Sequence, residues 1–138
     1  DDALLIRVSG REAPFRDIVA HDFWFRTLDY WRITSSYNAA QTQVNADGSS
    51  TYVVARSDPG AANWIDTGGL SEVVLVHRWQ GIAFDPRDAT GPAILAERVT
   101  RADIVRGIAA GTIPAITAED RERQRERRFK EFGLRYRE

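Results

Sequence analysis

Residues 72–80, with the sequence EVVLVHRWQ, give the strongest strand signal in the chain. Alternate residues of a strand point to opposite faces, so one face carries Val73, Leu75, His77 and Trp79. The other face carries Val74, Val76 and Arg78. Because both faces are apolar until the last residues, the pattern predicts a central strand of a sheet.

A hairpin is predicted just upstream, from residues 42–44 and 50–56 joined by Asn45-Ala46-Asp47-Gly48. Asp-Gly between two extended runs is a strong turn signal because glycine adopts a positive φ without steric cost. Across this turn we expect Val44 to face Thr51 or Tyr52. Pro59 ends the second arm, and residues 60–70 are expected to form a loop.

Further strands are predicted at residues 3–8, 15–20 and 94–99. Many short strands at hairpin spacing are typical of an antiparallel β-sandwich or jelly roll. The chain shows neither strand–helix alternation nor a GxGxxG or P-loop motif, so a nucleotide-binding α/β fold is not indicated. The fold class is therefore mainly β.

Two helices are expected after the strands, beginning at the capping patterns of Thr100 and Thr117. Ile104, Val105 and Ile108 form the apolar stripe of the first helix, which Gly111 ends. We divide the chain into a β-sandwich domain (1–100) and a helical C-terminal extension (101–138). The second helix has few apolar residues, so we expect it to add little to the stability of the body.

That second helix needs a partner, because an isolated helix of this length is marginal in water. Its apolar side chains are Phe129, Phe132 and Leu134. We expect them to pack on a second subunit, giving a homo-oligomer, or on a region that precedes the present sequence. The chain lacks methionine and begins Asp1-Asp2-Ala3, which indicates a fragment or processed product of a longer protein.

Composition limits the classes of function. The 138 residues hold 19 basic and 20 acidic side chains, so the net charge of −1 disfavours a globally basic nucleic-acid binder. No apolar run has the roughly 20 residues of a membrane helix. The absence of cysteine excludes disulfides and thiolate metal sites.

Lys130 is the only lysine, and this arginine bias is expected of a GC-rich bacterial genome or of arginines chosen for bidentate anion contacts. We expect a cytoplasmic protein.

One stretch carries a family resemblance. The motif is DPGAANWIDTGG at 58–69, followed by Arg78-Trp79 and preceded by Trp24-Phe25, Leu28-Asp29-Tyr30, SYNAAQ at 36–41 and Asp47-Gly48. Over residues 3–100 the chain resembles the domain of unknown function 1214 family. The resemblance implies a jelly-roll-like sandwich near the C-terminus of a longer protein, and it implies no chemistry. The chain departs from the family at Trp31-Arg32-Ile33-Thr34, where members often have an Asn-Arg-Gln run.

The candidate catalytic residues are His77, Arg78 and Asp66. Imidazole titrates near neutrality, so His77 is a potential general base or ligand contact, although a core or cavity-lining histidine with one hydrogen bond is the simpler interpretation. A charge on an apolar strand needs a partner, and we expect Arg78 to pair with Asp66 or Asp58 or to bind an anion.

Candidate ligand contacts are Trp64, Asn63, Asp58, Tyr37, Asn38 and Trp79. Oxygen ligands crowd the loop at 58–67, but Asx-turns explain them too, so no metal and no cofactor is predicted. We expect Trp64 to plug one end of the sandwich with its N–H bonded. Trp24, Phe25, Tyr30 and Trp31 join Tyr37 as residues that line either a cleft or the core.

Two functions remain open. The first is a binding or structural β-sandwich module of a larger bacterial protein, with a small-molecule ligand. The second is an enzyme domain that acts on a small, mostly apolar metabolite in a sandwich pocket.

Overall fold

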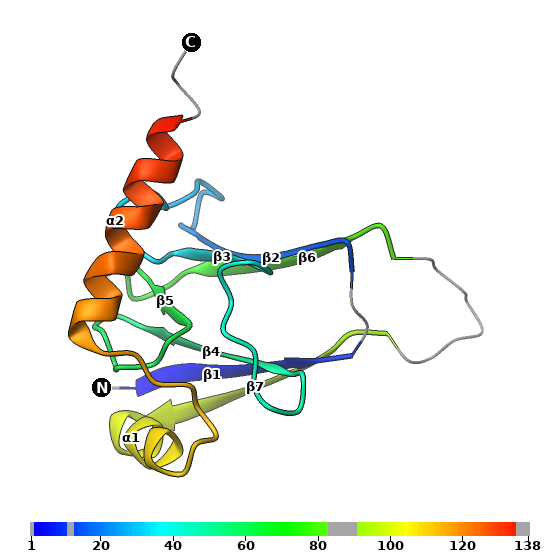
Figure 1. The fold of residues 1–138 in the computed structure, drawn as a ribbon, viewed down its shortest axis with the longest axis vertical. Helices are drawn as coiled ribbons and strands as arrows, with labels where there is room; N and C mark the ends of the chain where they lie inside the picture. Colours follow the sequence, from blue (N-terminus) through cyan, green and yellow to red (C-terminus); the bar gives the residue numbers. More distant parts are fainter. Residues whose placement is uncertain (1, 11–12, 83–90, 135–138) are drawn as a thin grey trace.

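The computed structural model describes residues 2–10, 13–82 and 91–134. Two facing sheets form a mainly β, mostly antiparallel sandwich with helices at the C-terminal end, as predicted (Figure 1). The four-stranded sheet has the order β5-β4-β1-β7 and the three-stranded sheet the order β3-β2-β6. The strands are β1 (Asp2–Ser9), β2 (Phe15–His21), β3 (Ser36–Asn38), β4 (Ser50–Ala55), β5 (Trp64–Asp66), β6 (Val74–Gln80) and β7 (Ala93–Thr100).

The main core lies between the sheets and follows the period of two in the strands. Ile6 and Val8 of β1 lie beside Tyr52 and Val54 of β4, and all four are buried. The opposite sheet contributes Ile18 and Ala20, together with Leu75 and Trp79 of β6. The predicted grouping of Val73, Leu75 and Trp79 on one strand face is therefore correct, and the structure shows that this face points inward.

A second core covers the outer face of the four-stranded sheet. Helix α1 (Arg101–Ala109) places Ile104 against Val53, Ala61 and Ile113. The predicted capping box at Thr100 is present, and Gly111 follows the helix end with φ 72°. Val105 was predicted to belong to the apolar stripe, but it is 56% exposed, so this part of the prediction is wrong.

Several local expectations are wrong. The hairpin is reduced to one bridge in which Val44 faces Ser50, one residue from the predicted register, because residues 42–44 do not form a strand. Residues 60–70 were expected to form a loop, but they contain the short strand β5, which pairs in parallel with β4. Trp64 and Ile65 of this strand are buried. The predicted central strand, β6, lies at the edge of its sheet.

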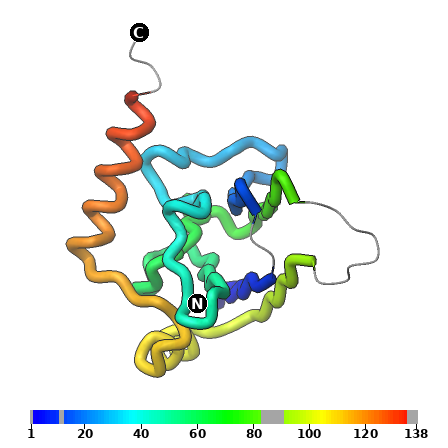
Figure 2. The backbone as a smooth tube through the Cα atoms, turned by 45° about the vertical axis from the view of Figure 1, so that its right-hand side comes forward, coloured from blue at the N-terminus to red at the C-terminus, as the bar shows by residue number. Residues whose placement is uncertain are grey.

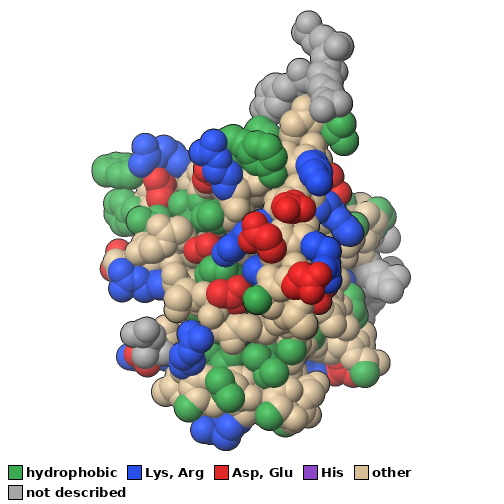
Figure 3. All heavy atoms as spheres, turned by 60° about the vertical axis from the view of Figure 1, so that its left-hand side comes forward, with side chains coloured by type: hydrophobic (Ala, Val, Ile, Leu, Met, Phe, Trp, Pro, Cys, Tyr) green, Lys and Arg blue, Asp and Glu red, His purple; other side chains and the backbone are tan. Residues whose placement is uncertain are grey.

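Helix α2 (Ala118–Leu134) crosses the open end of the sandwich, alongside both sheets (Figures 1 and 2). Thr117 caps it, with its hydroxyl accepting a hydrogen bond from the Asp120 amide at 3.1 Å. Acidic and basic side chains alternate over its outward side (Figure 3), where Arg123 pairs with Glu119 and Asp120. Among the described residues, no helix is long and apolar enough to span a membrane.

Candidate functional site

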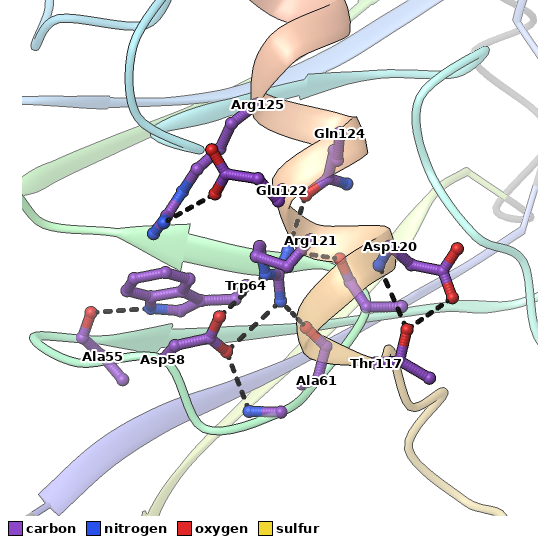
Figure 4. A network of polar contacts seen from close by, with 12 residues as sticks. Ala55, Asp58, Ala61, Trp64, Thr117, Asp120, Arg121, Glu122, Gln124 and Arg125 are labelled. Carbon is purple, nitrogen blue, oxygen red and sulfur yellow. Dashed lines mark hydrogen bonds and ion pairs between the residues drawn. The ribbon is translucent and has the colours of Figure 1, made fainter.

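Buried arginines anchor the inward side of α2. Arg121 is only 3% exposed, and its Nε donates to Oδ2 of Asp58 at 2.8 Å. The same guanidinium donates to the carbonyl oxygens of Ala61 and Ala62, the latter at 3.2 Å (Figure 4). One turn later, the guanidinium of Arg125 lies 5.8 Å from the Trp64 ring centroid. Asp58 and Trp64, two predicted site residues, therefore hold the helix.

Arg128 continues this face of the helix at i+7. It is 6% exposed, and its Cζ lies 4.9 Å from the ring centroid of Tyr37. Its Nη2 donates to the Ser36 carbonyl oxygen and its Nη1 to that of Tyr30 at 3.3 Å. Arginine's planar fork suits such contacts, so these two arginines help to attach a helix that has few apolar residues.

Tyr37 lies between the two buried arginines. Its hydroxyl donates to the carbonyl oxygens of Ala62 and Trp64, at 3.1 and 3.0 Å, and accepts from Nη1 of Arg121 at 3.4 Å. Burial raises the pKa of Tyr37. The neutral, fully buried phenol of Tyr37 therefore joins β3 to Ala62 and to the first residue of β5.

A hollow of about 340 Å³ lies between the C-terminal half of α2 and the outer face of the three-stranded sheet. We call it the α2 groove. Its floor combines the polar side chains of Asp17, Ser36, Asn38 and Arg78 with the apolar side chains of Phe15 and Val19. Its wall is formed by Tyr30, Trp31 and Phe132, and the last two stack with centroids 5.0 Å apart.

A larger hollow, of about 540 Å³, lies beside α1 and β7. Its lining includes Leu5, Leu95 and Ile104 but none of the candidate residues. We assign the candidate site to the α2 groove because Arg78, Tyr37 and Asn38 all line it.

The three candidate catalytic residues do not meet. Arg78 points outward into the α2 groove, whereas its neighbour His77 points inward and stacks on Trp79 with centroids 4.0 Å apart. Asp66 belongs to β5 in the other sheet. The expected pairing of Arg78 with Asp66 or Asp58 is wrong: Nε of Arg78 donates to Oδ1 of Asp17 at 2.9 Å, because these residues face each other between β6 and β2.

His77 is held as a neutral imidazole. Its two ring nitrogens are buried and have no hydrogen-bond partner among the described residues. Burial, and secondarily the charge of Arg16, lowers the pKa of His77 to about 4. The expected single hydrogen bond of a core histidine is therefore absent from the described contacts.

The polar loop at 58–67 is built from local hydrogen bonds. Oδ1 of Asp58 accepts from the Gly60 amide at 2.9 Å, and Oδ1 of Asp66 accepts from the Gly68 amide at 2.8 Å. Asn63 is buried, and its Oδ1 accepts from the Gln43 amide at 2.8 Å. Burial raises the pKa of Asp66. In the described part of the chain, no group of three or more metal-ligating side chains is found.

Trp64 fills the end of the sandwich, as expected. It is 3% exposed, and its Nε1 donates to the Ala55 carbonyl oxygen at 2.9 Å. The other predicted aromatic residues divide into two groups. Tyr30 and Trp31 line the α2 groove, whereas Trp24 and Phe25 are exposed by 75% and 62%.

The predicted helix anchors have contacts within the chain. The rings of Phe129 and Phe132 stack on Trp31, with centroids 5.3 and 5.0 Å apart, and Phe129 is 53% exposed. Leu134 is 61% exposed. Homo-oligomerisation, or docking to a preceding region, stays a prediction.

Sequence reasoning missed Asp17, Arg121 and Arg128. The spacing of Arg121, Arg125 and Arg128 was the available signal, because i, i+4 and i+7 lie on one helix face. Interleaved acidic residues concealed it, since alternating charges usually indicate a solvated helix.

Comparison with known proteins gives structural information only. No family model and no curated protein matches the chain. The chain is similar to the crystal structure of an uncharacterized protein from Burkholderia cenocepacia, with 30% identity and a TM-score of 0.64. The match covers 75% of this chain and 27% of that chain, so this sequence spans about a quarter of the length of that protein.

Proposed function

We propose that this chain is a ligand-binding β-sandwich module of a longer bacterial protein, and that the α2 groove holds a small, mostly apolar molecule. The proposal includes membership of the domain of unknown function 1214 family and a cytoplasmic setting. The motif at 58–69 supports the family, and the similarity to a longer Burkholderia cenocepacia protein is consistent with a modular role.

The carrying observation is the composition of the α2 groove. Ligand sites combine an apolar lining with a few placed polar groups and have volumes of roughly 300–1,000 Å³. The groove, at about 340 Å³, has an aromatic wall opposite a floor where polar side chains lie beside Phe15 and Val19. These surfaces come from three parts of the chain that lie far apart in sequence: the continuous segment from β2 to β3, strand β6, and α2.

A binding module fits this geometry better than an enzyme. The enzyme alternative needs His77, Arg78 and Asp66 to reach one substrate, and they lie on different faces or sheets. Arg78 forms an ion pair with Asp17 on the floor of the groove. No observation in the described residues favours a second function.

The test is calorimetric titration with 2-naphthalenemethanol, a neutral probe with an aromatic body. Val19→Phe fills the floor of the groove without removing a hydrogen-bonding side chain. Val74→Phe is the control, because Val74 is 37% exposed on the outer face of the same sheet and is not part of the groove lining. We expect wild type and Val74→Phe to bind the probe and Val19→Phe to lose binding. Equal binding by all three, or none by wild type, contradicts the proposal.

A further inference from the structure

Arg121 and Arg128 are buried to a similar degree but have different partners. Arg121 has a carboxylate partner in Asp58. Arg128 donates to the carbonyl oxygens of Tyr30 and Ser36 and to the Ser36 hydroxyl oxygen, all of them uncharged. Among the described residues Arg128 forms no ion pair.

The charge of Arg128 is therefore only partly compensated. Its Nε is buried and has no hydrogen-bond partner among the described residues. Burial lowers the pKa of Arg128, while Tyr37 and Glu131 oppose that effect. A buried cation is costly unless a counter-charge or hydrogen bonds satisfy it, so this position favours an incoming anion.

Arg128 is also placed where a ligand can reach it. It lines the α2 groove together with Ser36 and Asn38, which supply a hydroxyl and an amide. The other groove cation, Arg78, is already paired with Asp17. One uncompensated cation matches a single negative charge, which is the charge of a carboxylate and half that of a phosphate dianion.

We propose that the ligand of the α2 groove is an aromatic monocarboxylate, whose ring lies along Tyr30 and Phe132 and whose carboxylate faces Arg128. This inference rests on the proposed function and assigns the chemical class of its ligand. Glu131, an exposed carboxylate on the rim of the same groove, is the competing negative charge.

The test compares 2-naphthoate with 2-naphthalenemethanol by calorimetry at neutral pH. Hydrogen bonds to charged groups favour the carboxylate, so we expect wild type to bind 2-naphthoate about tenfold more tightly than the alcohol. Arg128→Met removes this preference while the alcohol still binds. Arg125→Met is the matched control on the same helix and keeps the preference, because Arg125 packs on Trp64 outside the groove.

Glu131→Gln keeps the test decisive if Arg128→Met fails to fold. Removing the competing charge tightens 2-naphthoate several-fold and leaves the alcohol unchanged. Three results would overturn the inference while the binding module stands. The first is equal affinity of wild type for the two probes, and the second is an equal response of both probes to Glu131→Gln. The third is tighter binding of 2-naphthyl phosphate than of 2-naphthoate. Failure of both probes to bind overturns the proposed function itself.

Discussion

Arg121 and Asp58 join α2 to the loop that follows β4, with Nε of Arg121 2.8 Å from Oδ2 of Asp58. The two residues are separated by 63 positions in the sequence, and the arginine side chain is 3% exposed. The same guanidinium reaches two backbone carbonyl oxygens of the loop. The helix is consequently attached through the motif that carries the family resemblance.

Replacing Arg121 by methionine is expected to destabilise the protein by roughly 3 kcal/mol, because it removes the ion pair with Asp58 and the guanidinium donors to two carbonyl oxygens. Urea unfolding measures this loss. Arg123→Met is the control: Arg123 is 57% exposed, so removal of its solvent-screened ion pairs is expected to change stability far less. Equal losses for the two variants would show that Arg121 does not hold the helix.

Ending the chain at residue 116 is expected to unfold the body or strongly lower its melting temperature. The truncation removes Arg121 and Arg128 and uncovers Tyr37 and Trp64. Composition alone predicts the opposite, a body that keeps its β-rich circular dichroism. Thermal melts followed by circular dichroism decide between these outcomes, and an unchanged melting temperature contradicts the structural account.

Trp64→Ala is expected to cost roughly 3–5 kcal/mol, because it deletes a buried aromatic side chain. The substitution also leaves the Ala55 carbonyl oxygen without the Nε1 donor. Trp24→Ala provides a matched control, since Trp24 is 75% exposed and its loss should stay within about 0.5 kcal/mol. In denaturant melts, a loss below 1 kcal/mol for Trp64→Ala would place this ring outside the core.

His77 makes stability depend on pH. Its pKa is lowered from 6.5 to about 4 in the folded protein, so the unfolded chain binds the proton first as the pH falls. The free energy of unfolding therefore decreases from about pH 6.5 downwards, and this contribution is lost over the interval to about pH 4. Asp66 has the opposite sign, because its raised pKa favours proton uptake by the folded state.

The measurement is urea unfolding of wild type and His77→Gln between pH 7 and pH 5, above most of the carboxylate range. We expect the wild-type free energy of unfolding to fall more steeply than that of the variant. Parallel curves would show that the imidazole titrates alike in the folded and unfolded states.

Strands and helix caps were predictable because their signals are local. The period of two at 73–79 grouped the residues of β6 that share one face, and the pattern at Thr100 identified the capping box of α1. Burial of Trp64 also followed, since a large aromatic beside turn residues needs a packed environment. Its neighbours Asp58 and Asn63 were noted, but their structural partners were not identified.

Pairings between distant segments were not predictable from these patterns. The partner of Arg78 depends on the register of β2 against β6, which places Asp17 opposite it across 61 positions. The short strand β5 lacks the length for a periodic signal, and β3 has the same limitation. The α2 groove needs all of these arrangements at once, so only its individual residues could be named in advance.

The most direct test of the central claim is a map of amide chemical shifts during titration of the isotope-labelled protein with 2-naphthalenemethanol. The account predicts shifts concentrated at β2, β3 and the C-terminal half of α2, including Val19, Ser36 and Phe132, while β7 and α1 stay unchanged. Shifts concentrated at β7 and α1, or no shifts at all, would contradict a ligand site in the α2 groove.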